Sequence, residues 1–160
     1  MISSAQLSPD GLYRYRLTRA WDGGLVGARP AVTWVMLNPS TADHQADDPT
    51  IRRCVAFAKT WGYGGIEVVN LFALRATDPA ELLRHADPVG LENDEHLRVV
   101  ASDAGRLIVC AWGAHRAAKA RGAQVLALLG ATARCLRRTK SGAPEHPLYL
   151  PGTLVAVAFG

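Results

Sequence analysis

The feature that most constrains the fold of this chain is a hydrophobic, β-branched run that ends abruptly in polar residues. Residues 31–40 read AVTWVMLNPS, so the apolar segment stops at Asn38-Pro39-Ser40. Such a run is typical of a buried strand in an open α/β sheet. Ligands bind at the carboxyl ends of these strands, because the loops there are released from strand pairing and the next helix directs its N-terminus at the ligand. We therefore expect the functional site beside Asn38.

The rest of the chain alternates apolar runs with helical patterns. A half-exposed strand, part of a hairpin or meander at the sheet edge, is predicted at residues 12–21, where large apolar and basic residues alternate. Further buried strands are predicted at 66–72, 106–112 and 133–136, and a final apolar segment spans 153–159. Helices are predicted at 49–61, with Asp48 as the N-cap, and at 79–85, 90–102 and 114–129.

This order of elements predicts one α/β domain over residues 1–160. The expected architecture is a three-layer α/β/α sandwich with a mostly parallel, four-stranded central sheet plus an N-terminal hairpin or edge strand. The chain is 49% hydrophobic and 20% charged, which excludes extended disorder. No apolar run reaches the roughly 18 to 20 residues of a membrane helix, and the N-terminus lacks the pattern of a signal peptide. We expect a cytoplasmic monomer without a membrane partner.

No metal and no cofactor are expected. Cys54, Cys110 and Cys135 lie far apart without a C-x-x-C pair, which predicts reduced core residues and excludes an iron-sulfur cluster. The loop at 43–48 carries carboxylates of the kind that hard cations prefer. Asp48 is better explained as a helix cap, and the loop has no glycine for the sharp turn of an EF-hand.

Four polar signals follow the predicted strands. They are Asn38 with Pro39 and Ser40, Asn70, Trp112-Gly113 with His115, and His146-Pro147 on a long loop after the fourth strand. A lone Asn at a strand end is usually a turn former. Two Asn and a loop His at equivalent places favour a shared site instead, because parallel strands bring their carboxyl ends to one edge of the sheet.

The sequence resembles a known family over nearly its whole length, from about Tyr13 to Pro151. The segments that carry the resemblance are MLNPSTAD, DDPTIRRC, WGYGG, VVNLFALRAT, AWG and HPLYLP. They are similar to the DUF1643 family, for which no activity is established.

A more distant resemblance is to the uracil-DNA glycosylase superfamily. Its first strand ends in G-x-N-P-G or G-x-D-P, which matches Leu37-Asn38-Pro39-Ser40 without the glycines; its L-W-G and H-P-S-P motifs are similar to Ala111-Trp112-Gly113 and to the His146-Pro147 loop. In that superfamily an Asn at the end of the next strand recognises the base edge, so the resemblance implies a site around Asn38, Asn70 and His146. Together with the residue chemistry below, this predicts Asn38, His146 and Asp43 as catalytic residues and Pro39, Ser40, Asn70, Phe72 and Tyr149 as substrate-binding residues.

The residue chemistry suits this assignment. The Asn70 amide offers a donor and an acceptor to a base edge, and Asn38 can position a water through its carbonyl. His146 can donate to the base as negative charge builds on it, and Asp43 is the nearest carboxylate for a general base. A flipped base would stack on an aromatic ring, for which Phe57, Tyr63, Phe72 and Tyr149 are candidates.

Several basic residues are candidates for contacts with nucleic-acid phosphates. The net charge of +4 and the pI of about 9.3 permit a polyanionic partner without demanding one. A solvated basic face is the ordinary explanation of such residues, but the densest patch is adjacent in sequence to His146. The candidate phosphate contacts are Arg52, Arg53, Arg75, Arg137, Arg138 and Lys140.

Three functions remain open. The first is a glycosylase-type hydrolase that acts on a base in nucleic acid, DNA more than RNA. The second is a non-catalytic module that binds a nucleobase or nucleotide in the same pocket. The third is an enzyme on free nucleosides or nucleotides, which would lack the steep salt dependence of a protein that neutralises many phosphates.

Overall fold

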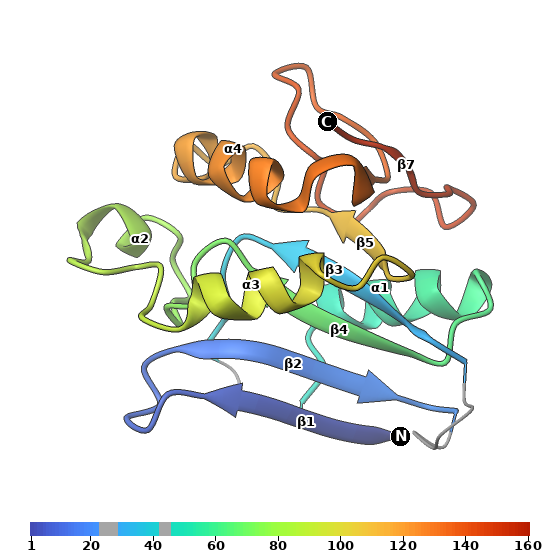
Figure 1. The fold of residues 1–160 in the computed structure, drawn as a ribbon, viewed down its shortest axis with the longest axis horizontal. Coiled ribbons are helices and arrows are strands. Elements are labelled where there is room, and N and C mark those ends of the chain that lie inside the picture. Colours follow the sequence, from blue (N-terminus) through green and yellow to red (C-terminus); the bar gives the residue numbers. More distant parts are fainter. Residues whose placement is uncertain (23–28, 42–45) are drawn as a thin grey trace.

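The computed structural model describes residues 1–22, 29–41 and 46–160. These form one mixed sheet of seven strands with four α-helices (Figure 1). The strands are β1 (Ile2–Leu7), β2 (Arg14–Ala20), β3 (Ala31–Met36), β4 (Gly65–Asn70), β5 (Leu107–Cys110), β6 (Ala133–Cys135) and β7 (Val157–Ala158). The helices are α1 (Pro49–Thr60), α2 (Glu81–Arg84), α3 (Asn93–Ala101) and α4 (Ala118–Leu129), with a short 3-10 helix at Gly130–Thr132.

The centre of the sheet is parallel and its two margins are antiparallel. The strand order is β1-β2-β4-β3-β5-β6-β7. β4, β3, β5 and β6 run parallel, whereas β2 pairs antiparallel with β4, and β7 pairs antiparallel with β6. Met36 pairs with Asn70 and Val35 with Cys110, so the carboxyl ends of the central strands are level with one another.

Helices cover both faces of this sheet. In Figure 1, α3 and α4 lie in front of the sheet and α1 lies behind it. The side chains of β3 alternate accordingly: Trp34 packs in the core under α1, and Val35 packs in the core under α3 and α4. The predicted mixed α/β fold with a parallel centre is confirmed. None of the helices in the described ranges has the length and hydropathy needed to cross a bilayer.

The N-terminal part of the sheet differs from the prediction. The segment predicted as an edge strand is β2, and it is an interior strand between β1 and β4. The edge strand is β1, which the sequence pattern did not reveal because its side chains are mostly exposed. The seven strands also exceed the predicted four-stranded sheet with an added hairpin or edge strand. Tyr15 forms a bulge in β2, since Gln6 pairs with Arg16 and Leu7 with Arg14.

The helix after β3 begins as predicted. The carboxylate of Asp48 accepts a hydrogen bond from the Ile51 N–H at 2.8 Å, and Pro49 occupies the first turn, where its missing N–H costs nothing. The three cysteines are free and buried, as predicted. α4 begins four residues later than predicted. A turn precedes it, in which the Ala118 N–H donates to the His115 carbonyl and the Ala117 N–H donates to Nδ1 of His115.

A buried polar network crosses the sheet on the α3 side. Glu67 in β4 forms ion pairs with Arg16 and Arg106, and Arg106 also donates to the Thr33 hydroxyl at 3.0 Å. Glu67 is 5% exposed, whereas both arginines reach solvent. The network ties β2, β3 and β4 together at the end of the sheet opposite the polar loops.

We predict that Glu67→Gln lowers the free energy of unfolding by about 2 to 3 kcal/mol, because two guanidinium groups lose their carboxylate while partly buried. Urea unfolding measures the change. The control is Glu95→Gln, which removes an exposed ion pair with Arg98 and should cost less than about 0.5 kcal/mol. Equal effects of the two substitutions would contradict the assigned importance of Glu67.

Candidate functional site

The polar loops meet where the order of the parallel strands reverses. β3 is the first parallel strand in the chain; β4 lies on one side of it, and β5 and β6 lie on the other. In open α/β sheets, ligands bind in the crevice outside the carboxyl ends of the strands at this switch point. The loop after β3 begins at Leu37, and the loop after β5 contains Trp112 and Gly113. We call this place, defined by the ends of β3, β4 and β5 and the loops that follow them, the switch crevice.

Asn38 holds the loops of the switch crevice together. Its Nδ2 donates to the backbone oxygens of Ala76 at 2.9 Å and Pro39 at 3.0 Å, with a longer contact to Leu74. Both amide hydrogens are therefore used within the protein, and only Oδ1 is left for a ligand or water. The loop is fixed further by the Ala76 N–H, which donates to the Pro39 carbonyl at 3.0 Å.

Asn70 differs from Asn38 in that its side-chain amide is not used within the described part of the fold. Its residue is 3% exposed, yet its side-chain amide makes no hydrogen bond with any part of the chain that the structure describes. Neither of its polar atoms is fully enclosed. Val68 packs under α1 and Val69 under α3 and α4, so the strand alternation directs Asn70 to the α1 face. A buried amide without a partner is costly unless a ligand or water completes it.

The backbone beneath Asn70 is held from the opposite face. Asn93 in α3 donates to the carbonyls of Asn70 and Leu71, at 3.0 and 3.1 Å. Arg121 in α4 also donates to the Leu71 carbonyl, and it forms an ion pair with Asp94. These contacts fix the backbone at the end of β4, from which the Asn70 side chain projects.

His146 lies half-buried beside the loop that follows β5. A Cβ on Gly113 would stand 3.9 Å from the Cβ of His146, and the Gly113 N–H donates to the Pro144 carbonyl. Nδ1 accepts from the Leu148 N–H at 3.2 Å, so the proton of the neutral imidazole lies on Nε2. Burial lowers the pKa of His146, and the nearby carboxylate of Asp48 opposes this only in part. Near pH 7 the side chain is a neutral donor.

The structure places two of the predicted central residues at the ends of neighbouring strands and a third near the start of α1. Asn38 and Asn70 end neighbouring strands, and His146 is within the electrostatic reach of Asp48 at the start of α1. Pro39 is buried and Ser40 is half-buried in the loop between them. Asp43, the predicted general base, lies outside the described residues.

The two aromatic residues predicted to contact substrate have opposite environments. Phe72 is buried in the core under α3 and α4. Tyr149 is 93% exposed, and its φ of 70° lies in the left-handed region that side chains other than glycine seldom adopt. The Leu150 N–H donates to the Pro147 carbonyl, which closes a tight turn with Tyr149 at its third position.

Two predicted phosphate contacts are used inside the protein. Arg75 donates to the carbonyls of Gly11 and Thr41, at 3.0 and 3.1 Å, and so joins two loops. Arg53 in α1 donates to the Leu150 carbonyl and stacks over a phenylalanine ring of its own helix. Both side chains serve the fold.

The basic residues after β6 are also partly engaged. Arg137 forms an ion pair with Glu145 at 2.9 Å, and the Arg138 guanidinium lies 4.9 Å from the centre of the Phe159 ring. They remain on the surface, where phosphate can reach them. The exposed members of the predicted set are Arg52, Arg137, Arg138 and Lys140.

The sequence analysis missed one charged residue on the α1 face. Arg14 in β2 is 7% exposed, and its side chain forms no hydrogen bond or ion pair with any described residue. Alternating basic residues at 12–21 were visible in the sequence, but they predicted only an edge strand. A strand in the sheet interior turns such a residue inward.

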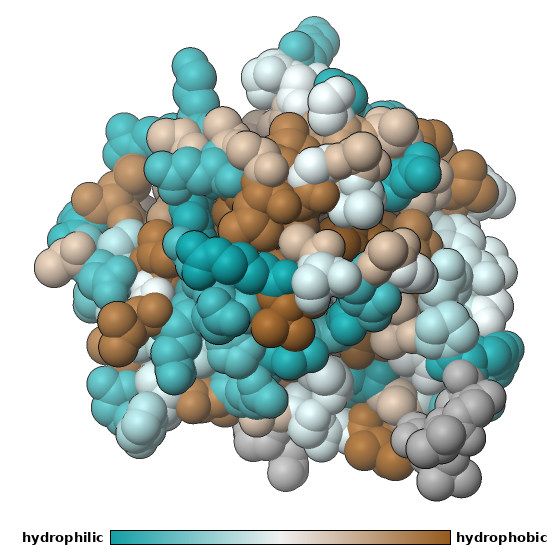
Figure 2. All heavy atoms as spheres, in the orientation of Figure 1, coloured by the Kyte–Doolittle hydropathy of each residue, from teal (hydrophilic) through white to brown (hydrophobic). Residues whose placement is uncertain are grey.

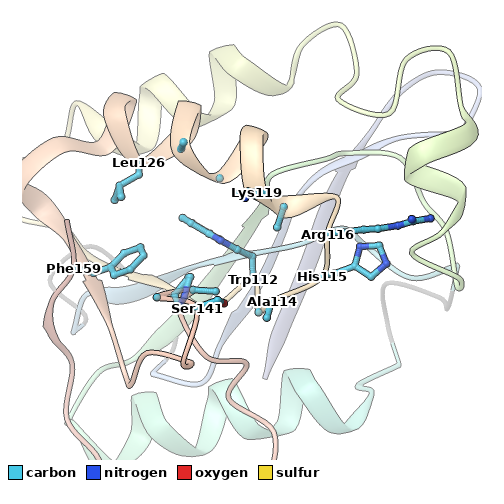
Figure 3. A pocket seen from close by; sticks show the side chains of 15 residues that line it. Trp112, Ala114, His115, Arg116, Lys119, Leu126, Ser141 and Phe159 are labelled. Carbon is cyan, nitrogen blue, oxygen red and sulfur yellow. The ribbon is translucent and has the colours of Figure 1, made fainter.

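A separate cavity of about 370 Å³ lies between α4 and the loop at 141–144 (Figure 3). Trp112, Leu126 and Phe159 form its apolar wall, and His115 and Lys119 lie among its polar residues. Figure 2 shows hydrophobic side chains gathered around α4 and the C-terminal segment in this view. The cavity lies on the α4 side of the sheet. Trp112, Gly113 and His115, one of the four strand-end signals, line it, whereas none of the predicted catalytic, substrate-binding or phosphate-contact residues does. Across the described ranges, no three His, Cys, Asp or Glu side chains gather to hold a metal ion.

Residues 14–148 match the family model of DUF1643, which is described as a protein of unknown function. Comparison with curated proteins and with solved structures gave no match. The likeness to the uracil-DNA glycosylase superfamily therefore rests on the strand-end motifs alone.

We predict that protonation of His146 destabilises the fold. Its pKa is lowered in the folded chain, so the unfolded chain binds more protons once the pH falls below the ordinary value near 6.5. Stability should be full above that pH and decline as the pH falls towards the lowered pKa. Chemical unfolding between pH 7.5 and 5.5 should show a shallower decline for His146→Asn. Burial also lowers the pKa of His96, so His96→Asn should remove a further part. Parallel curves for wild type and His146→Asn would contradict this assignment.

Proposed function

The chain belongs to the DUF1643 family, and from its site we propose that it recognises a nucleobase at the switch crevice. Hydrolysis of an N-glycosidic bond is the reaction that the groups around this crevice suit best. The alternatives are a binding module without turnover and an enzyme on free nucleosides or nucleotides. All three use the same pocket, and they differ in the fate of the bound base.

The observation that carries the proposal is the Asn70 amide. A positioned carboxamide offers one donor direction and one acceptor direction side by side, which is complementary to the edge of a pyrimidine. Asn70 is buried and rigidly supported by Asn93, yet its amide has no partner among the described residues. A structural asparagine would use its amide within the fold, as Asn38 does.

His146 supports the same proposal by its protonation state. A leaving base accumulates negative charge on an oxygen or nitrogen, and a fixed donor lowers the energy of that state. A neutral imidazole with its proton on Nε2 supplies such a donor, and the Leu148 N–H on Nδ1 keeps it in that form. The lowered pKa means that this holds near neutral pH.

The attacking water is the weaker part of a hydrolytic proposal. Asn38 has only its Oδ1 free to orient a water, because its amide hydrogens hold the loop. The carboxylate of Asp48, which acts electrostatically on His146, is already used, because it accepts the N-cap hydrogen bond of α1. More of the described contacts support recognition of the base than support its release. Binding and release therefore have to be measured separately.

Tyr149 is a suitable stacking partner for an unpaired base. An exposed aromatic ring at positive φ costs free energy, and such strain persists where function requires it. Tyr149 lies three residues after His146, in the tight turn that directly follows that histidine. A base stacked on this ring would gain about 1 to 3 kcal/mol, whatever its identity.

We predict that Asn70→Ala weakens nucleobase binding roughly tenfold or more, because the base edge loses both hydrogen bonds. Binding and base release should be measured on single-stranded and double-stranded oligonucleotides that contain uracil or another modified base, and on free nucleosides. His146→Ala should reduce release more than binding. Gln6→Ala removes an exposed amide on β1 and serves as the control, with no expected change.

Each outcome selects among the three functions. Release that depends on Asn70 and His146 indicates a hydrolase, and binding without release indicates a module. Steep loss of affinity with salt indicates nucleic acid rather than a small ligand. Wild-type protein that binds none of the oligonucleotides, nucleosides or nucleotides would refute the proposal.

For Tyr149 we predict opposite effects on stability and binding. Tyr149→Asn should raise the free energy of unfolding by about 0.5 to 1 kcal/mol, because asparagine tolerates the left-handed conformation better. The same substitution should weaken binding to a single strand about fivefold or more, because the stacking contact is lost. Leu91→Asn, at another highly exposed position, is the control for removing apolar surface. Unchanged binding by Tyr149→Asn would exclude the stacking role.

A further inference from the structure

Arg14 is a buried cation without a counter-ion in the part of the chain that the structure describes. Its residue is 7% exposed, and its Nε is fully enclosed without a hydrogen-bond acceptor. The two terminal nitrogens also lack partners there, but they are not fully enclosed, so a ligand can reach them. Arginine is seldom buried unless it is paired, because moving an unpaired charge out of water is costly.

The charges around Arg14 do not neutralise it. The pKa of Arg14 is lowered to about 10, chiefly by burial and also by the positive charge of Arg75, against a smaller opposing effect of Asp48. Arg19 adds a third positive charge. Asp48 caps α1, and the nearby carboxylate of Asp47 forms an ion pair with Arg19 at 2.7 Å. At pH 7 Arg14 is therefore charged, and both carboxylates near it have other partners.

The position of Arg14 relates it to Asn70. β2 pairs with β4, and the Arg14 N–H donates to the Ala73 carbonyl just beyond the end of β4. The influence of Asp48 and Arg19 on Arg14 indicates that its side chain extends towards the start of α1. Asn70 faces the same side of the sheet. Two neighbouring strands thus present to one region an amide and a guanidinium that have no partner among the described residues.

We propose that Arg14 binds the terminal phosphate of a nucleotide whose base is read by Asn70. This inference rests on the proposed function and names its substrate class. A guanidinium offers two parallel N–H donors to two phosphate oxygens, which is the geometry of a strong bidentate contact. Only the ends of the Arg14 guanidinium are open. That access suits a phosphate monoester at a chain end or on a free nucleotide better than an internal phosphodiester, which continues on both sides.

The test compares ligands that differ only in the phosphate. Titration calorimetry of the wild-type protein should show that a nucleoside 5′-monophosphate binds roughly tenfold or more tightly than the same nucleoside. An oligonucleotide with a 5′-terminal phosphate should exceed its dephosphorylated form by a similar factor. Equal affinities in both pairs would overturn the proposal.

Arg14→Met gives an independent readout. Without ligand, in chloride, this variant should melt at the same temperature as the wild type or higher, because an unpaired buried charge is replaced by an apolar side chain of similar length. Inorganic phosphate at matched ionic strength should raise the melting temperature of the wild type and not of the variant. Arg84→Met, which removes an exposed arginine of α2, should keep the phosphate effect.

The outcomes separate this inference from the proposed function. If Arg14→Met binds the nucleoside normally but no longer prefers the monophosphate, both stand. If wild type and Arg14→Met bind nucleoside and monophosphate alike, base recognition stands and the phosphate site is refuted. If Arg14→Met does not fold, Arg14 has a structural role that the proposal denies, and the paired ligands with wild-type protein still decide the phosphate preference.

Discussion

The constraint on which the rest of the structure depends is the central position of β3. It pairs in parallel with β4 on one side and β5 on the other, in a register that sets Met36 beside Asn70 and Val35 beside Cys110. This register makes the loops after three strands begin at one level. It also forces the chain to cross the sheet on both faces, with α1 on one and α3 and α4 on the other. The switch crevice is a geometric consequence of that crossing.

Two asparagines at neighbouring strand ends show how a structural residue differs from a candidate binding residue. Asn38 uses both amide hydrogens to hold the loop around Ala76, so its removal would be felt first by the fold. Asn70 is more deeply buried and makes no such bond among the described residues, although Asn93 holds the backbone below it. The sequence motif treats the two as equivalent. The distribution of their hydrogen bonds does not, and it moves the emphasis from Asn38 to Asn70.

The parts of the fold that were predictable from sequence are those in which local chemistry and burial agree. The run that became β3 and the Asp48 cap of α1 were both identified, because a two-sided buried strand and a capped helix each leave a strong local pattern. The exposed edge strand β1 was missed, since its residues pack against little and show no buried face. Arg14 was missed for a related reason: whether a basic residue in β2 points to water depends on which strand pairs beside it, and β4 is distant in sequence. The cavity beside Trp112 likewise needs α4 and the C-terminal segment together.

A chain of this kind balances stability against readiness to bind. The network around Glu67 completes its charges within the protein, at the end of the sheet away from the crevice. At the crevice, by contrast, the amide of Asn70 and the guanidinium of Arg14 are left without partners among the described residues, and Tyr149 occupies a strained conformation. Each of these features lowers the stability of the unliganded protein. One ligand could contact all three, with its base edge on Asn70, its ring face on Tyr149 and its anion on Arg14. The Glu67 network shows that the same fold can complete a buried charge within the protein, and the binding interpretation of Asn70 and Arg14 rests on that contrast.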